Sequence, residues 1–260
     1  PYQAHPGIPL PGQLFSPVRE NSASLDLSDR SSLAPLFTEI DEALGREWTA
    51  KPIVSGREIE GTPLPVRDPN DQRHHAGTVM ESSESAIEQA LTAARAAFPD
   101  WSASPAESRA AALETYARLL EGARAEAMAL CIREAGKTIP DALAEVREAV
   151  DFARYYAARA RADFSQPLTL PGPTGEDNSI ALVGRGIFTC ISPWNFPLAI
   201  FSGQILAALA AGNTVIAKPA EQTPLIASFA VRLMHQAGIP EDVLHLLPGP
   251  GATVGAALAG

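Results

Sequence analysis

The end of the chain alternates three times between a short apolar run and a longer stretch of helical character. The apolar runs read "GIFTCI" at 186–191, "TVIAK" at 214–218 and "VLHLL" at 243–247, and Gly212 and Gly238 stand where the first two helices would end. The unbroken apolar character of "GIFTCI" predicts a strand covered on both faces. Strand and helix joined by short loops, three times over, confine this part of the chain to a parallel sheet of the doubly wound type.

The residues before this alternation predict a proline-rich start, then small strands, then long helices. Five prolines among the first 17 residues disfavour regular structure, so 1–40 is interpreted as an extended arm or linker. The turn-rich residues 50–80 predict small strands. Apolar residues spaced by three and four predict a helix at 87–98. The sequence "SPAE" at 104–107 is typical of a capping box and predicts a helix that continues to Leu130.

A further helix and a hairpin complete the first part of the chain. Gly136 ends the preceding run, and Thr138 is expected to cap a helix that continues to about Ala162. At 165–185 two extended segments flank a Pro/Gly turn, which is typical of a β-hairpin or flap. The expected fold is therefore α/β. An arm precedes one unit at 41–260, which combines a helical N-terminal part, a β-flap and a Rossmann-like parallel sheet.

Composition narrows the range of partners without identifying one. Hydrophobic residues make up 46% of the 260 residues, and the formal net charge of −10 argues against nucleic acid or an anionic membrane as a partner. Two cysteines make no disulfide framework in a chain of this length, and no metal site is expected. No stretch reaches the ~18 apolar residues of a membrane span and no signal pattern is visible, so we expect a cytoplasmic protein.

Three loops with unusual polar residues follow the three predicted strands. They read "SPWN" at 192–195, "KPAEQ" at 218–222 and "PGPG" at 248–251. In an open parallel sheet, ligands bind outside the carboxyl ends of the strands, so these loops are expected to meet at one edge of the sheet.

Two of these loops suit either a nucleotide or a plain structural role. Gly249, Gly251 and Gly255 are spaced as G-x-G-x-x-x-G rather than the usual G-x-G-x-x-G. They suit either a turn under a phosphate or an ordinary joint between strand and helix. Lys218 and Glu221 suit either the ribose hydroxyls of a nucleotide or a surface ion pair of little consequence.

The remaining loop contains Asn195, whose role the sequence leaves open, while the two cysteines have one interpretation. The amide of Asn195 suits a donor to a developing oxyanion, or an N-cap for the helix that starts near Pro197. Cys190 lies in an apolar strand run and Cys131 lies in a helix, so both are interpreted as small buried hydrophobes.

The stretch "ISPWNFPLAIFSGQILAALAAGNTVIAKPAEQTPLIA" closely resembles the aldehyde dehydrogenase superfamily, and the resemblance covers roughly 45–260. The residues "REAGKT" and "DALAEVREAVDFARYYA" resemble the branch that oxidises L-glutamate γ-semialdehyde, the open form of Δ1-pyrroline-5-carboxylate. The arm sequence "GIPLPGQLFSPVRENSASLDLSD" is similar to the segment that follows the proline dehydrogenase domain in bifunctional proline utilization A proteins.

This resemblance implies a role for most of the polar loop residues. Asn195 is expected to be the oxyanion donor, Phe196 a wall of the aldehyde tunnel, and Glu134 a residue facing the substrate. The flap at 165–185 is expected to join copies into a homo-oligomer. The residues expected to bind NAD, rather than NADP, are Ile191, Ser192, Pro193, Trp194, Lys218, Ala220, Glu221, Gly251 and Gly255.

The implied activity is the NAD-dependent oxidation of L-glutamate γ-semialdehyde to L-glutamate in proline catabolism. In that family the Cys nucleophile and the Glu that activates water lie further along the chain. We therefore expect these residues to be a segment of a longer bifunctional protein with an incomplete NAD-binding domain. Its FAD would bind to the proline dehydrogenase part and not to this segment. The alternatives are a non-catalytic nucleotide-binding module and a dehydrogenase for another semialdehyde.

Overall fold

The computed structural model describes residues 7–260. The α-helices are α1 (Arg30–Leu44), α2 (Glu84–Ala103), α3 (Ala106–Gly122), α4 (Arg124–Ala135), α5 (Ile139–Phe164), α6 (Ala199–Ala210), α7 (Pro224–Gln236) and α8 (Ala256–Ala259). The strands are β1 (Trp48–Ala50), β2 (Ile53–Val54), β3 (Arg57–Glu58), β4 (Pro63–Arg67), β5 (His75–Met80), β6 (Leu168–Leu170), β7 (Asn178–Ile180), β8 (Ile187–Ile191), β9 (Thr214–Lys218) and β10 (Leu244–Leu246). Short helical turns lie at Pro11–Gln13 and Gly251–Gly255.

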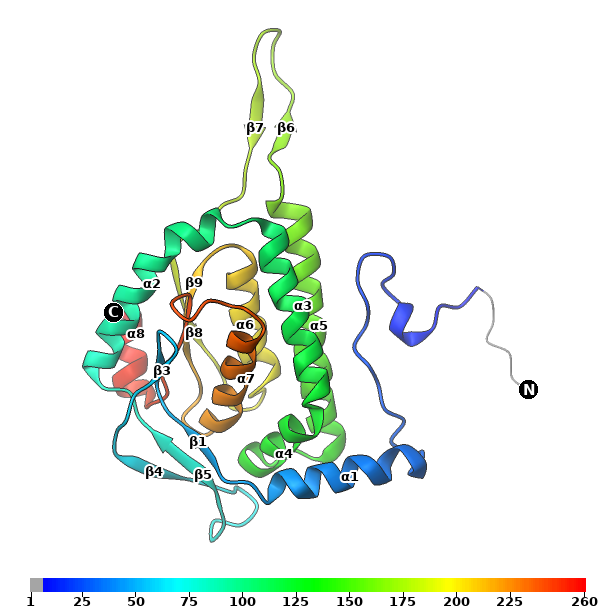
Figure 1. Cartoon of the computed structure of the whole chain (residues 1–260), viewed down its shortest axis with the longest axis vertical. Helices are drawn as coiled ribbons and strands as arrows, with labels where there is room; N and C mark the ends of the chain where they lie inside the picture. The colour runs from blue at the N-terminus through cyan, green and yellow to red at the C-terminus, as the bar shows by residue number, and fades with distance from the viewer. Residues whose placement is uncertain (1–6) are drawn as a thin grey trace.

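The helices and the main sheet stack in layers (Figure 1). Helix α2 covers one face of the sheet that contains β8, β9 and β10, and α6 and α7 cover the other face. Helices α3 and α5 pack against each other and form a further layer beside α6. The side chains of Tyr116, Phe201, Leu206 and Leu209 are fully buried, and they belong to the hydrophobic core that fills these layers.

The main sheet has five strands in the order β3-β2-β10-β9-β8. Strands β10, β9 and β8 are parallel, which confirms the predicted strand–helix alternation. The antiparallel strands β2 and β3 extend the sheet, and Ser55 (φ 50°) and Gly56 (φ 70°) form the tight turn between them. Two residues with positive φ suit the twist of a two-residue hairpin.

Strand β8 differs from the prediction, because it forms an edge of the sheet. Only Cys190 is buried in it, while Phe188 is 41% and Ile191 is 47% exposed. The expected full burial of this run was therefore wrong within the described residues, although α2 and α6 each contact β8. Strand β9 has this property instead: all five of its residues are buried, because it has a strand on each side and helices on both faces.

Two details of the predicted helices are also wrong. Ser104 does not cap α3. Its hydroxyl donates to the carbonyl of Trp101, so it closes α2, and Pro105 precedes α3 without a side-chain cap. The helix expected to reach Leu130 breaks at Ala123 (φ −100°, ψ 20°), directly after Gly122. Glycine is a poor helix former, which favours a break at this position.

The expected boundaries around α5 are confirmed. Gly136 ends α4 in the left-handed conformation (φ 66°), and the Thr138 hydroxyl accepts from the backbone N–H of Asp141 at the start of α5. The hairpin of β6 and β7 projects away from the layers, as Figure 1 shows.

The arm predicted at 1–40 is extended for only part of that length. Residues 1–6 lie outside the described residues. Helix α1 begins at Arg30, with the Asp29 carboxylate accepting from the N–H of Ser31, and Pro35 lies inside the helix. A boundary between residues 40 and 41 would therefore cut through α1. The prolines of this region favoured an extended arm, so the sequence did not predict this capped amphipathic helix.

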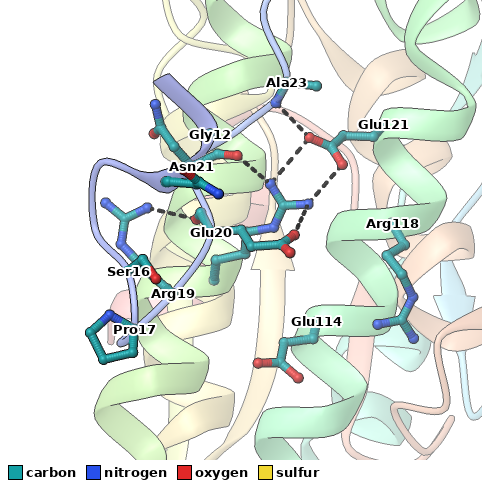
Figure 2. Close-up of a pocket in the computed structure, with 12 residues that line it drawn as sticks. Gly12, Ser16, Pro17, Arg19, Glu20, Asn21, Ala23, Glu114, Arg118 and Glu121 are labelled. Atoms are coloured by element: carbon teal, nitrogen blue, oxygen red, sulfur yellow. Dashed lines mark hydrogen bonds and ion pairs between the residues drawn. The ribbon is translucent and has the colours of Figure 1, made fainter. Parts of the chain in front are cut away.

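The extended part of the arm is held against α3 and α5 (Figure 2). The N–H and the hydroxyl of Ser22, which is 3% exposed, donate to the Asp151 carboxylate at 2.9 and 2.7 Å. Arg154 donates to the Asn21 carbonyl and forms an ion pair with Glu121. These contacts leave a cavity of about 850 Å³ between the arm and the two helices.

Candidate nucleotide and oxyanion site

The three loops predicted to meet at the carboxyl edge of the sheet are joined by hydrogen bonds. The N–H of Ser192 donates to the carbonyl of Lys218 at 3.1 Å. The N–H of Gly251 donates to the Glu221 carboxylate at 2.6 Å. Because parallel strands place their carboxyl ends at one edge, Glu221 and Gly251 become neighbours although they are 30 positions apart in the sequence. The expected convergence of the loops is confirmed.

Lys218 and Glu221 do not form a simple surface ion pair. Lys218 is only 3% exposed, and its ammonium donates to the carbonyl of Pro219 at 3.0 Å. Burial lowers the pKa of the Lys218 ammonium, and the charge of Glu221 acts in the opposite direction. One Glu221 oxygen is held by Gly251, which leaves the exposed carboxylate able to accept from a ligand hydroxyl.

The glycines of the third loop differ in whether the fold itself requires them. A Cβ on Gly249, where φ is +151°, would lie 2.5 Å from Cγ2 of Val254, so the turn itself requires glycine. A Cβ on Gly251 would lie 3.5 Å from Oε1 of Glu221, and one on Gly255 would lie 3.8 Å from Cε of Lys218. These are ordinary contacts, so internal packing does not demand glycine at Gly251 or Gly255. A bare backbone there leaves a cradle of the kind that a phosphate approaches.

Asn195 does not cap the helix that follows it. Helix α6 begins at Ala199, and the N–H groups of Leu198 and Ala199 donate to Oε2 of Glu145 at 3.2 and 2.9 Å. The N-cap alternative for Asn195 is therefore wrong. Within residues 7–260 the Asn195 side chain makes no hydrogen bond and is exposed, so its amide can donate to a bound group.

The residues beside Asn195 combine exposed aromatic rings with one unpaired hydroxyl. Trp194 is 58% and Phe196 is 38% exposed, and the exposed Ile191 is the last residue of the edge strand β8. The hydroxyl of Ser192 is buried and has no partner among the described residues. A buried polar atom without a partner is rare, and it marks a place where a ligand or water completes the hydrogen bonding.

Glu134, which was expected to face the substrate, lies inside the protein. It is 3% exposed, and its two oxygens accept from the N–H groups of Leu225 and Ile226 at 2.6 and 2.9 Å. Burial raises the pKa of the Glu134 carboxyl to about 8, although these two hydrogen bonds lower it. Its role is to cap the N-terminus of α7, so the expected contact with substrate was wrong.

Both cysteines are buried thiols, as predicted. Burial raises the pKa of Cys190 to about 12 and that of Cys131 well above its ordinary value. Nucleophilic attack needs the thiolate, which neither environment favours. Among the described residues no three His, Cys, Asp or Glu side chains are grouped to hold a metal ion. No helix in this part of the chain is long and apolar enough to cross a membrane.

The sequence reasoning missed two residues of this region, Lys137 and Glu145. The ammonium of Lys137 lies 3.0 Å from Oε1 of Glu145 and 4.9 Å from the centroid of the Phe196 ring. A signal was available, since Glu145 lies beside Val146 on the apolar face of α5. A carboxylate there must find partners inside the protein.

Comparison with known proteins places the chain among proteins of one family. A model described as the aldehyde dehydrogenase family matches residues 55–260. Bifunctional protein PutA of Klebsiella aerogenes is 48% identical over 254 residues, which is 98% of this chain and 18% of that protein. 1-Pyrroline-5-carboxylate dehydrogenase 2 of Bacillus subtilis strain 168 is 35% identical over 231 residues, which is 88% of this chain and 44% of that protein.

A solved structure of 1-pyrroline-5-carboxylate dehydrogenase from Thermus with bound NAD has a TM-score of 0.87 and 32% identity, over 92% of this chain and 47% of that chain. The chain thus spans less than half the length of each of these three relatives. The family match covers the three loops, the two capping carboxylates and every strand of the main sheet except β2. The chain belongs to the aldehyde dehydrogenase family.

Proposed function

We propose that this chain supplies the NAD site and the oxyanion donor of an enzyme that oxidises L-glutamate γ-semialdehyde to L-glutamate. The enzyme would be part of a longer bifunctional protein that also contains a proline dehydrogenase. The names of the relatives support the substrate and the bifunctional parent. The observation that carries the proposal is the meeting of three loops at one sheet edge, beside an exposed and unbonded Asn195 amide.

The residues at this edge fit NAD. Glu221 and Lys218 offer an acceptor and a donor to ribose hydroxyls, and the negative charge of Glu221 disfavours the 2′-phosphate of NADP. Gly251 and Gly255 leave room for the pyrophosphate. Ile191, Ser192, Pro193, Trp194 and Ala220 would complete the walls of this site. NAD, when bound, supplies a hydride acceptor. The solved Thermus relative with bound NAD supports the choice of cofactor.

The role proposed for Asn195 is to stabilise charge. When a thiolate attacks an aldehyde, negative charge develops on the former carbonyl oxygen, and the amide of Asn195 would donate to that oxygen. Phe196 would form an aromatic wall beside the aldehyde. Since the thiols of Cys131 and Cys190 are buried, the attacking thiolate would come from another part of the longer protein.

Three further proposals concern the longer protein. The hairpin of β6 and β7 exposes Leu168 (65%) and Ile180 (51%), so it would form an apolar contact between copies in a homo-oligomer. FAD would bind to the proline dehydrogenase part. A cytoplasmic location stays a prediction from the sequence.

The test of the proposed function is the reduction of NAD by the full-length protein in the presence of L-glutamate γ-semialdehyde. Turnover with this substrate in preference to shorter semialdehydes without the α-amino acid group is the expected result. NAD binding without any aldehyde turnover would favour the non-catalytic module. Preference for another semialdehyde would overturn the substrate assignment alone.

The cofactor assignment has its own test in Glu221→Gln. Losing the negative charge is expected to weaken NAD binding by about tenfold, the value of one hydrogen bond to a charged group, and to improve binding of NADP relative to NAD. Titration of both cofactors by fluorescence measures the two affinities. An unaltered ratio of NAD to NADP affinity would remove Glu221 from the ribose site.

A further inference from the structure

We propose that Lys137 and Glu145 are positioning residues that hold the loop of Asn195 in its catalytic place. This inference rests on the proposed function, because it assigns a purpose to the position of Asn195. The two residues lie on the connection between α4 and α5 and on α5 itself, away from the three loops in the sequence.

The loop at 192–198 is anchored at both ends and unsupported by its own side chains. At its start, the N–H of Ser192 donates to the Lys218 carbonyl. At its end, the N–H groups of Leu198 and Ala199 donate to Glu145. Between these anchors, the side chains of residues 194–196 make no hydrogen bond within the described part of the chain. The position of Asn195 therefore depends on what holds the ends of the loop.

Lys137 connects the second anchor to the middle of the loop. Its ammonium lies 3.0 Å from Oε1 of Glu145 and 4.9 Å from the centroid of Phe196, the neighbour of Asn195. The contact with Glu145 is not aligned as a hydrogen bond, so it acts mainly through charge. A cation over an aromatic face is attracted to it within ~6 Å. One ammonium thus contacts both the carboxylate that ends the loop and the ring beside the amide.

Burial limits the screening of the attraction between Lys137 and Glu145. The side chain of Glu145 is 2% and that of Lys137 is 19% exposed, so water and salt weaken their attraction little. The neighbouring carboxyl of Glu148 senses the same charges: burial raises its pKa first, the charge of Glu145 raises it further, and Lys137 lowers it. Removal of the Lys137 ammonium would remove the positive charge that offsets the effect of Glu145 on Glu148.

A second buried carboxylate provides a matched control. Glu134 caps α7 with two backbone N–H bonds, as Glu145 caps α6, and the two residues are 3% and 2% exposed. Glu134 differs because the helix it caps does not follow Asn195, and because no cation pairs with it among the described residues. A general effect of losing a buried helix cap should appear in both Gln variants, whereas an effect on Asn195 should appear only at Glu145.

The experiment compares Glu145→Gln, Lys137→Met and Glu134→Gln in the full-length protein. At saturating NAD and semialdehyde, we expect kcat to fall by about 10- to 100-fold in the first two variants, since a misplacement of about 1 Å costs this order of rate. NAD affinity in these two should stay within about twofold. Glu134→Gln should retain most of kcat. Lys137→Met also serves where Glu145→Gln lowers the yield of folded protein.

Two readouts separate positioning from a merely structural role. In an Asn195→Ala background, Glu145→Gln should cause no further loss of kcat, because it acts through Asn195. Hydrogen exchange at 193–199 should accelerate in Glu145→Gln and Lys137→Met and stay unchanged in Glu134→Gln. Equal losses of kcat at Glu145 and Glu134, or unchanged exchange at 193–199, would overturn the inference. Absence of wild-type turnover would contradict the proposed function, while the exchange experiment still decides the positioning of the loop.

Discussion

At the residue scale, the sequence does not assign a role to a side chain whose chemistry suits several roles. Asn195 is equally good as an oxyanion donor and as a helix N-cap, and only the position of Glu145 excludes the cap. Glu134 carries the same carboxylate as a substrate-binding residue would, yet it is buried at the start of α7. The residue types of the site are predictable from the sequence. The partner of each one depends on which helix ends meet in three dimensions.

The buried Glu134 predicts a dependence of stability on pH. Burial raises its pKa from 4.5 to about 8 in the folded state, so the folded protein holds a proton that the unfolded chain releases. The contribution to stability is fully present below pH ~4.5 and is lost as pH rises toward ~8, by up to about 1.4 kcal/mol per pH unit. Glu134→Gln removes this titration. Chemical denaturation at pH 5 to 8 should show the stability of the wild type falling relative to that of Glu134→Gln as pH rises, and a constant difference between the two proteins would contradict the assignment.

The glycine turn predicts opposite results for two alanine substitutions. Gly249→Ala should lower stability, because a Cβ would lie 2.5 Å from Val254 at a φ of +151°. Gly251→Ala meets only an ordinary contact, so the fold should persist while the methyl group obstructs the pyrophosphate. Thermal melts and NAD titrations of both variants separate these effects. Normal NAD affinity in a folded Gly251→Ala protein would argue against the phosphate cradle.

At the element scale, periodicity and glycines predicted most strands and helices correctly, whereas capping residues predicted the starts of helices less well. The strands β8, β9 and β10, the helices between them and the ends at Gly136 and Thr138 follow from local patterns. The prediction that Ser104 caps α3 was wrong because its hydroxyl donates to the carbonyl of Trp101 in the turn that ends α2. The start of α1 was missed because the Asp29 cap stands in a stretch that composition alone marks as irregular.

The extended part of the arm predicts a local test. Asp151 accepts both hydrogen bonds of Ser22 and forms an ion pair with Arg19. Asp151→Asn should weaken docking of the arm by about 1–3 kcal/mol, the value of hydrogen bonds to a charged group. Limited proteolysis should then cut the arm at 12–23 faster. Arg159→Met, which breaks the α5 surface pair with Asp163, is the control on the same helix. Equal cleavage in all three proteins would contradict the role of Asp151 in holding the arm.

At the scale of the whole molecule, the α/β class and the carboxyl-edge site follow from the sequence. The place of β8 at the sheet edge and the addition of β2 and β3 to the sheet do not, since both depend on contacts between distant segments. The carboxylates that cap α6 and α7 also depend on contacts between distant segments. Carboxylates on α4 and α5 cap the two helices that cover one face of the sheet, so a layer remote in the sequence holds the starts of those helices.

The most direct measurement is kcat of Asn195→Ala in the full-length protein, with NAD affinity measured alongside. The account predicts a fall of about 10²–10³ in kcat, the cost of one oxyanion donor, with the NAD dissociation constant within about twofold of wild type. The amide has no structural partner within residues 7–260, so the variant should fold normally. Unchanged turnover by a folded Asn195→Ala protein would contradict the role of Asn195 and the site built around it.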